Sequence, residues 1–216
     1  MNLIRNALCS LLCLASLPSF ALSEQGQQQL QQLQSRWAEI NYQLPEKQRE
    51  AAFAKLSEQA QQAVSAEPKA AELLIWRGII LSTYAGAKGG LGALGLVKQA
   101  KASLEQALDA DPEALSGSAY TSLGSLYYQV PGWPIGFGDD DKAEALLKRA
   151  LSINPNGIDP NYFYGDFLQR NKRYDEARAV LQKALQAPAR PGRALADQGR
   201  RKEIEALLAK VQSKLD

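Results

Sequence analysis

The stretch AEALLKRALSINP, residues 143–155, decides the fold of this 216-residue chain. It places alanines seven residues apart at Ala143 and Ala150, with Leu147 between them and Pro155 five residues later. Small residues and a leucine at this spacing lie on one face of a helix, where a neighbouring helix can approach closely. The proline then ends the helix and turns the chain.

The same pattern occurs in two further places. Its members are Ala100, Leu104, Ala107 and Pro112 in one copy and Ala177, Leu181 and Ala184 in the other, where the prolines are displaced to Pro188 and Pro191. A helical unit that recurs in this way cannot bury its apolar face alone and must stack on copies of itself. The sequence therefore predicts an all-α fold, a short solenoid of stacked helical hairpins.

The composition excludes several classes of function. The formal net charge is +2, without the strongly basic balance that nucleic-acid binding proteins carry. The chain has no histidine, the commonest general base and metal ligand, and no motif for a catalytic nucleophile stands out. We therefore expect a non-catalytic protein with no cofactor and no metal, and an enzyme is only a remote alternative.

The first 21 residues resemble a cleaved signal peptide. Arg5 provides a positive start, residues 7–17 form a short apolar core, and small residues stand at Ser19 and Ala21. The apolar run is shorter than the ~20 residues of a membrane span. We predict that the protein is exported, to the periplasm of a bacterium; a signal that is retained as an anchor is the alternative.

Both cysteines, Cys9 and Cys13, lie within this signal. Leu8 and Leu12 precede them, where a lipoprotein signal would have a small residue, so we do not expect a lipid anchor. The mature chain would contain no cysteine and hence no disulfide or thiolate. No later segment is apolar enough to predict a transmembrane helix.

Helical periodicity divides the remainder of the chain into three parts. We predict an N-terminal capping hairpin at residues 22–68, three hairpin units at 69–191 and a C-terminal capping helix at 192–216. The helices are expected at residues 24–42, 45–67, 69–84, 96–110, 115–129, 142–153, 161–171, 174–186 and 195–215.

The three units resemble the tetratricopeptide repeat, a 34-residue helix-turn-helix with Gly in its first helix and Ala, Leu, Ala and Pro in its second. In the third unit Gly165 and Ala177 are 12 residues apart, as in that repeat, but the corresponding distances are 22 and 19 residues in the first and second units. This predicts insertions at 85–95 and 130–141, between the two helices of each unit. Because corresponding turns of stacked repeats lie side by side, we expect the insertions to form a shared rim that binds a partner.

The second insertion, PGWPIGFGDDD at residues 131–141, is the most distinctive segment. Two interpretations of Trp133 and Phe137 stay open: the rings fold back onto their own hairpin as a plug, or they form the wall of a ligand site. For Asp139 and the two aspartates after it we predict helix capping rather than calcium binding, because further oxygen ligands at loop spacing are absent.

The first insertion contains GLGALG at residues 90–95, which matches G-x-G-x-x-G. A dinucleotide site would need a preceding strand, and here a helix precedes it, so nucleotide binding is not expected. We predict a flexible apolar loop that packs beside Trp133. An alternative is an anion site at the start of the following helix, near Lys98 and Lys101.

The family resemblance implies a concave surface formed by the first helix of each unit. The implied positions are Glu72, Ile75, Ile79, Ser82 and Thr83, then Ser118, Thr121, Ser125, Tyr128 and Gln129, then Asp159, Tyr162, Asp166, Gln169 and Arg170. Together with the rim they give the candidate binding residues Tyr128, Trp133, Phe137, Tyr162, Asp166, Gln169 and Arg170. The basic residues Arg190, Arg193, Arg200, Arg201 and Lys202 are expected to be a solvated face, or alternatively an acceptor for anionic partners.

These features favour an exported adaptor protein. The segment 131–141 beside the repeats is similar to bacterial periplasmic proteins of the TRAP-transporter T-component type. That resemblance implies an accessory that engages a transporter's solute-binding protein. The expected partner is another periplasmic protein or an extended peptide, with a small organic ligand as a further candidate. The alternative is a general cell-envelope scaffold for protein–protein interaction.

Overall fold

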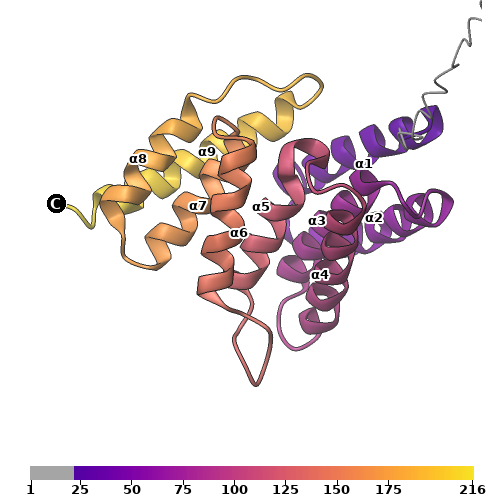
Figure 1. The fold of residues 1–216 in the computed structure, drawn as a ribbon, viewed down its shortest axis with the longest axis horizontal. Coiled ribbons are helices and arrows are strands. Elements are labelled where there is room, and N and C mark those ends of the chain that lie inside the picture. Colours follow the sequence, from indigo (N-terminus) through magenta and orange to yellow (C-terminus); the bar gives the residue numbers. More distant parts are fainter. Residues whose placement is uncertain (1–21) are drawn as a thin grey trace, which may run out of the picture.

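The structure, a computed structural model, describes residues 22–216, so the predicted signal peptide lies outside the described residues. Within this range the chain forms nine α-helices and no strand (Figure 1), which confirms the all-α prediction. The helices are α1 Glu24–Tyr42, α2 Glu46–Ala66, α3 Ala71–Lys88, α4 Ala93–Ala110, α5 Ala114–Gln129, α6 Asp140–Ile153, α7 Ile158–Arg170, α8 Tyr174–Leu185 and α9 Ala194–Gln212. Among them, none is long and apolar enough to cross a membrane.

Consecutive helices pair into hairpins that stack along the chain. The pairs are α1 with α2, α3 with α4, α5 with α6 and α7 with α8, and the first helix of each later pair packs on the first helix of the pair before it. α9 packs on α8 and α7 and also reaches α1, at the other end of the stack. The described chain is therefore a helical solenoid whose last helix returns to its first hairpin (Figure 1).

The repeated glycine and leucine form one packing contact, which recurs in three hairpins. A Cβ atom on Gly124 would lie 2.8 Å from Leu147 Cγ and 3.3 Å from the carbonyl oxygen of Ala143. The same contact pairs Gly78 with Leu104 and Gly165 with Leu181. Each of these leucines is fully buried. Glycine in the first helix thus makes room for the leucine of the second, which explains the spacing seen in the sequence.

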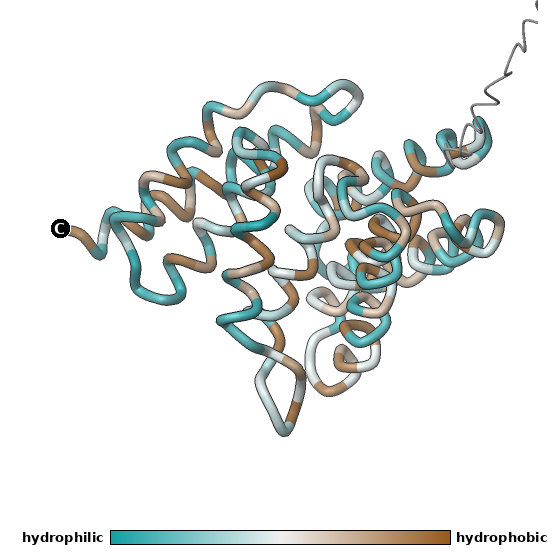
Figure 2. Tube along the Cα trace, in the orientation of Figure 1, coloured by the Kyte–Doolittle hydropathy of each residue, from teal (hydrophilic) through white to brown (hydrophobic). Residues whose placement is uncertain are grey.

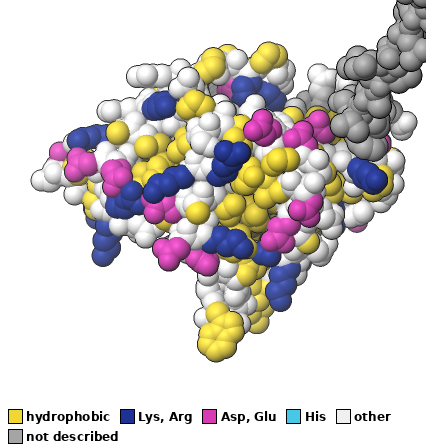
Figure 3. All heavy atoms as spheres, in the orientation of Figure 1, with side chains coloured by type: hydrophobic (Ala, Val, Ile, Leu, Met, Phe, Trp, Pro, Cys, Tyr) yellow, Lys and Arg dark blue, Asp and Glu magenta, His cyan; other side chains and the backbone are white. Residues whose placement is uncertain are grey.

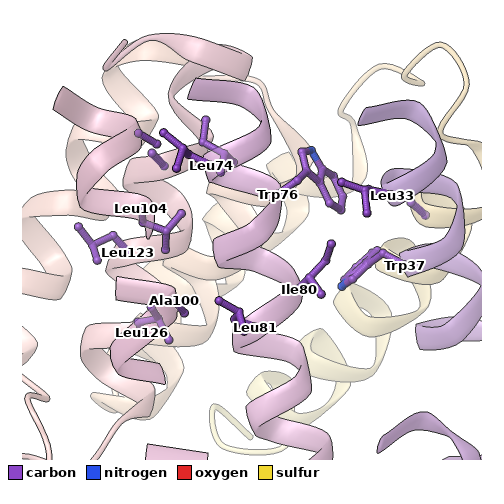
Figure 4. Close-up of a cluster of buried hydrophobic side chains, with 14 of the residues drawn as sticks. Leu33, Trp37, Leu74, Trp76, Ile80, Leu81, Ala100, Leu104, Leu123 and Leu126 are labelled. Atoms are coloured by element: carbon purple, nitrogen blue, oxygen red, sulfur yellow. The ribbon is translucent and has the colours of Figure 1, made fainter. Parts of the chain in front are cut away.

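The hydrophobic core is continuous along the stack. Figure 4 shows α3 at its centre, with Trp76 facing Leu33 and Trp37 of α1, and with Leu104 and Leu123 on its other side. The alternation of polar and apolar residues along each helix is visible in Figure 2, and it keeps one face of each helix in the core.

The first insertion is helical for most of its length, so the prediction of a loop at residues 85–95 is wrong. α3 continues to Lys88, and α4 begins at Ala93, three residues before its predicted start. Gly89 and Gly90 have φ values of +65° and +59° and separate the two helices. Alanine-rich sequence on both sides of these glycines extends both helices instead of forming a loop.

The first turn of α5 is left-handed. Leu115, Ser116 and Gly117 have φ values of 47°, 56° and 73°, which puts a kink where the sequence predicts a regular helix start. Left-handed conformations are unfavourable for residues with a Cβ atom. Gly117 packs closely on the side chain of Ile153, where a Cβ atom would clash. The surrounding structure therefore holds a strained turn, and such turns are often found at functional sites.

Candidate functional site

The connection between α5 and α6, residues 130–139, is compact, and we call it the rim loop. Its backbone is held by hydrogen bonds: the Gly138 N–H donates to the Pro131 carbonyl oxygen at 3.0 Å, and the Asp139 N–H donates to the Tyr127 carbonyl oxygen at 2.9 Å. The first bond joins the two arms of the loop, and the second fixes its C-terminal end on α5. The loop thus presents its tip from a defined backbone conformation.

Glycines allow the rim loop to fold this tightly. At Gly138 an added Cβ atom would collide with the carbonyl oxygen of Val130, and at Gly136 it would collide with that of Pro131. The Asp139 side chain accepts a hydrogen bond from the Lys142 N–H at 3.0 Å, which confirms the predicted cap of α6.

The two aromatic rings of the rim loop behave differently. Phe137 packs edge-on against Tyr127, with ring centroids 5.4 Å apart, and Lys101 Nζ lies 5.7 Å from its centroid. Trp133 is 90% exposed and Ile135 is 59% exposed. The plug interpretation is therefore correct for Phe137 and wrong for Trp133. Figure 3 shows this end of the molecule as a projecting hydrophobic tip.

The α4 residue Lys101 contacts the rim loop from outside the first insertion, so the shared rim of the two insertions stays a prediction. Besides its contact with Phe137, its ammonium group forms an ion pair with Glu105 at 2.7 Å. Lys101 is therefore engaged with protein groups, which leaves the predicted anion site at the start of α4 without one of its two lysines. Leu91, in the turn before α4, is 82% exposed, so the first insertion also presents an apolar residue to solvent.

A second site lies on the concave side of the stack, a central cavity of about 680 Å³ lined by α1, α2, α3, α5, α7, α9 and the segment before α9. The concave positions implied by the repeat pattern that line it are Ile79, Ser82, Thr83, Ser118, Thr121, Ser125, Gln129 and Asp159. Trp133 and Phe137 are not among its lining residues, so the interpretation of these rings as walls of a ligand site does not hold for this cavity.

One wall of the central cavity is aromatic. Trp37 and Trp76, which are labelled in Figure 4, meet edge to face with ring centroids 5.9 Å apart. Both residues line the cavity. The Trp37 Nε1–H donates a hydrogen bond to Thr83 Oγ1 at 2.9 Å, which fixes the ring. Both tryptophans come from helices of the first two hairpins and are held by the core behind them.

A network of ion pairs lies where α9 meets α7. The Asp159 carboxylate pairs with Arg190 at 2.5 Å and with Arg200 at 2.8 Å. Arg190 also pairs with Asp197 at 2.6 Å, and Arg200 pairs with Glu203 at 2.5 Å. Burial alone would raise the pKa of Asp159, but the nearby guanidinium groups of Arg200 and Arg190 outweigh it and lower this pKa to about 2.

The predicted solvated basic face is therefore wrong for most of its members. Arg190 and Arg200 are paired in this network, and Arg201 donates hydrogen bonds to the carbonyl oxygens of Leu185 and Ala187 at the end of α8. These arginines attach α9 to α7 and α8 because their carboxylate and carbonyl acceptors lie on those neighbouring elements.

α9 also contacts several of the concave positions of the third unit. The Arg200 guanidinium stacks 4.3 Å from the Tyr162 ring centroid, and Lys210 Nζ lies 3.4 Å from Gln169 Oε1. The sequence pattern predicts an open, charged end of the groove here. The structure instead has α9 across it, because paired charges bring this helix back along α7.

The remaining candidates, Tyr128, Asp166 and Arg170, form one cluster. The Tyr128 hydroxyl donates to Asp166 Oδ2 at 2.9 Å, and Arg170 Nε lies 3.1 Å from the same oxygen. The Arg170 guanidinium also lies 5.3 Å from the Tyr128 ring centroid. Burial, followed by the charge of Asp166, raises the pKa of Tyr128. A partner role for these residues stays a prediction.

The sequence pattern missed the residues that α1, α2 and the segment before α9 contribute to the central cavity. Among them are Trp37, Asn41, Arg49 and Arg193. Trp37 is visible in the sequence only as part of an apolar stripe, and Arg193 only as one of several basic residues. A repeat pattern predicts where residues lie within each unit. It does not predict that a terminal helix such as α9 packs over the groove.

Comparison with known proteins supports the repeat assignment. Residues 135–196, which span the rim loop tip to the start of α9, match the family model described as tetratricopeptide repeat. The matched residues lie in the second and third units, and the match supports a tetratricopeptide-repeat family for the chain. Solenoids of this kind present extended concave surfaces to other proteins, so the fold suggests an adaptor for protein–protein interaction.

Several solved structures are similar to the chain at low sequence identity. MamA has 22% identity, with 78% of this chain and 92% of that chain covered and a TM-score of 0.44. TTC0263, a thermophilic tetratricopeptide-repeat protein of Thermus thermophilus, has 18% identity over 85% of this chain and 99% of that one, with a TM-score of 0.45. PilF of Pseudomonas aeruginosa has 15% identity over 88% and 92%, with a TM-score of 0.35. No curated protein sequence matches the chain.

Proposed function

We propose that this protein is a non-catalytic adaptor that binds another protein through the rim loop, with Trp133 as the anchor. The observation that carries the proposal is a tryptophan that is 90% exposed at the tip of a loop fixed by its own hydrogen bonds. Large exposed apolar side chains that project from a defined backbone are typical of interaction sites.

The fixed conformation of the rim loop supports a role for it in binding a partner. Ordering a mobile loop on binding costs free energy, and a loop that is already ordered avoids this cost. Glycines, prolines and the packed ring of Phe137 hold the rim loop in place, while Ile135 extends the apolar surface beside Trp133. Tryptophan is also the residue most enriched among those that dominate binding energy at interfaces.

Leu91 enlarges this surface from the neighbouring hairpin. It lies in the turn between α3 and α4, and α4 contacts the rim loop through Lys101 and Phe137. The partner we propose has an apolar pocket for Trp133 and a shallower apolar contact for Leu91. Charged residues at the edge of that contact, such as Asp140 and Lys98, would affect the rate of association more than the final affinity.

The Trp133→Ala variant should bind the partner at least about 30-fold more weakly, because loss of an interface anchor costs about 2 kcal/mol or more. Its free energy of unfolding should change by less than about 0.5 kcal/mol, because the side chain makes little contact with the rest of the protein. The partner for this test is a protein that the wild type captures from an envelope extract and that is then purified. Calorimetric titration with this partner measures the affinity of each variant. Urea unfolding measures the stability.

Leu91→Ala serves as the matched control, since it removes an exposed apolar side chain from the neighbouring connection. Its affinity loss should be smaller than that of Trp133→Ala. Equal affinity of wild type and Trp133→Ala for the partner would support the alternative, a general scaffold that binds through other surfaces.

The cellular setting of the adaptor is a further part of the proposal. The signal-like sequence at residues 1–21 supports export to the periplasm without a lipid anchor. The rim segment supports the narrower hypothesis of an accessory to a TRAP-type transporter, in which the partner is the transporter's solute-binding protein. Testing the purified solute-binding protein in the same titration separates this hypothesis from other envelope partners.

A further inference from the structure

Arg193, the residue before α9, differs from its paired neighbours Arg190 and Arg200. Its guanidinium lies 4.7 Å from the Trp76 ring centroid and lines the central cavity. Its Nε atom is buried and has no hydrogen-bond partner among the described residues. No ion pair joins Arg193 to a carboxylate in the described part of the chain, whereas Arg190 and Arg200 each have two.

An unpaired donor in such a position is unfavourable. A buried polar group without a hydrogen bond lowers the stability of the folded state, and more so when it is charged. Burial, followed by the positive charge of Arg190, lowers the pKa of Arg193 to about 10, so the guanidinium is still protonated at neutral pH. An anion bound in the cavity would pair with the charge of this guanidinium.

Three unused hydroxyl groups on α5 also line the central cavity, and we call them the hydroxyl wall. Within residues 22–216, the side chains of Ser118, Thr121 and Ser122 make no hydrogen bond to another residue, although all three line the cavity. The left-handed turn at Leu115 and Ser116 lies on the same lining. A ligand in the cavity would therefore have both aromatic rings and free hydroxyl groups within its lining.

We propose that the central cavity binds a small organic carboxylate. Its carboxylate pairs with the Arg193 guanidinium, its apolar part packs on Trp37 and Trp76, and its other polar groups contact the hydroxyl wall. The cavity volume of about 680 Å³ is within the range of roughly 300–1,000 Å³ that is usual for small-molecule sites.

The charges around Arg193 favour a carboxylate over a phosphate ester. One planar guanidinium matches the two oxygens of a single carboxylate. A dianionic phosphate would need a second available cation. Arg190 and Arg200 are already paired, and the third other arginine of the lining, Arg49, donates its Nε–H to the Leu44 carbonyl oxygen. Asp159 and Glu203 also line the cavity and would repel the additional negative charge. A monoanion therefore fits this lining best.

This ligand site is separate from the rim loop and goes beyond the proposed adaptor function. Neither Trp133 nor any other residue of the rim loop lines the central cavity. Loss of ligand binding would leave the rim intact, and loss of partner binding in Trp133→Ala would leave the cavity intact. The two proposals can consequently fail independently.

Fluorescence titration with matched probes tests the site. The chain contains three tryptophans, so the Trp133→Phe background leaves Trp37 and Trp76, both at the cavity, as the only tryptophan reporters. The probes are phenylacetate, 4-phenylbutyrate and 6-phenylhexanoate, each with its neutral amide. We expect saturable binding of at least one acid, with its amide about tenfold weaker or more, because the amide carries no charge to pair with the Arg193 guanidinium.

The Arg193→Gln variant should lose about tenfold or more in affinity for the acid and keep its affinity for the amide, as the loss of a charge-assisted bond predicts. Arg149→Gln is the matched control, because Arg149 also stacks on an aromatic ring, 5.8 Å from the Tyr120 centroid, but does not line the cavity. Circular dichroism checks that each variant folds. If Arg193→Gln is unfolded, Arg193→Lys takes its place and should show a reduced preference for the acid over the amide.

Three results would overturn the proposal. The first is that none of the acids binds saturably. The second is that acid and amide bind the wild type equally, which would show that the charge is not recognised. The third is that the folded variant at Arg193 keeps the full preference for the acid.

Discussion

Replacing Leu147 with alanine should lower the free energy of unfolding by about 2–5 kcal/mol, because this side chain is fully buried in the contact between α5 and α6. Deleting three carbon atoms removes favourable burial and leaves a cavity beside Gly124. Chemical unfolding followed by circular dichroism measures the change. Leu146→Ala, which alters the partly buried neighbour, should cost clearly less.

A second substitution makes this prediction specific to the glycine–leucine contact. In the wild type, a Cβ atom on Gly124 would lie only 2.8 Å from Leu147, so Gly124→Ala should be destabilising despite the better helix propensity of alanine. In the Leu147→Ala background the clash is gone, and Gly124→Ala should instead recover part of the lost stability. A double-mutant cycle with no coupling between the two sites would contradict the packing described above.

Replacing Asp159 with alanine should destabilise the protein by about 3–5 kcal/mol, since it leaves Arg190 and Arg200 without a shared carboxylate in a partly buried site. The ion pairs at Asp159 join α7 to α9 and to the segment before it, so α9 should detach first. Asp175→Ala is the control: Asp175 pairs with Arg178 on the surface and is 77% exposed, so the expected change is within about 0.5 kcal/mol. Similar losses in the two variants would contradict this role of Asp159.

The dependence of stability on pH provides a second readout of the same variant. The pKa of Asp159 is about 2 in the folded protein, below its ordinary value of 3.8, because of Arg200 and Arg190. A carboxylate with a lowered folded-state pKa contributes stability above its unfolded pKa and loses it as the pH falls through the folded pKa. The wild type should therefore lose about 2 kcal/mol between pH 5 and pH 2 from this group alone. Asp159→Ala should lack that component.

Much of the fold could be predicted from the sequence because it is fixed by contacts within one hairpin. The spacing of Gly124, Ala143 and Leu147 reports a contact between two neighbouring helices, and it repeats in three units. The Asp139 cap is equally local, because the acceptor and the N–H that it binds are three residues apart. Local patterns of this kind predict where helices begin and end and which residues pack together.

The features that the sequence did not predict depend on contacts between distant residues. The third unit's groove is closed because Asp159 pairs with Arg200, 41 residues later, and Tyr42 contacts Glu203, 161 residues later. No spacing rule connects such positions. The central cavity is the result of these long-range contacts, and the role of Arg193 depends on which neighbouring arginines have already taken the available carboxylates.

The rim loop combines features that could be predicted from the sequence with one that could not. Its length follows from counting residues against the repeat, and its packed Phe137 is one of the two outcomes that the sequence left open. The full exposure of Trp133 could not be predicted, because it depends on backbone hydrogen bonds that direct the tip of the loop away from the hairpin. Hydrophobicity alone would favour burial of this ring.

Amide hydrogen exchange of the protein with and without its captured partner tests the central claim most directly. If the rim loop is the binding surface, exchange should slow most within residues 130–139, with a smaller effect in the turn around Leu91. Exchange in α8 and α9 should stay unchanged. Slowing confined to those helices, with no change in the rim loop, would contradict the claim that Trp133 anchors the partner.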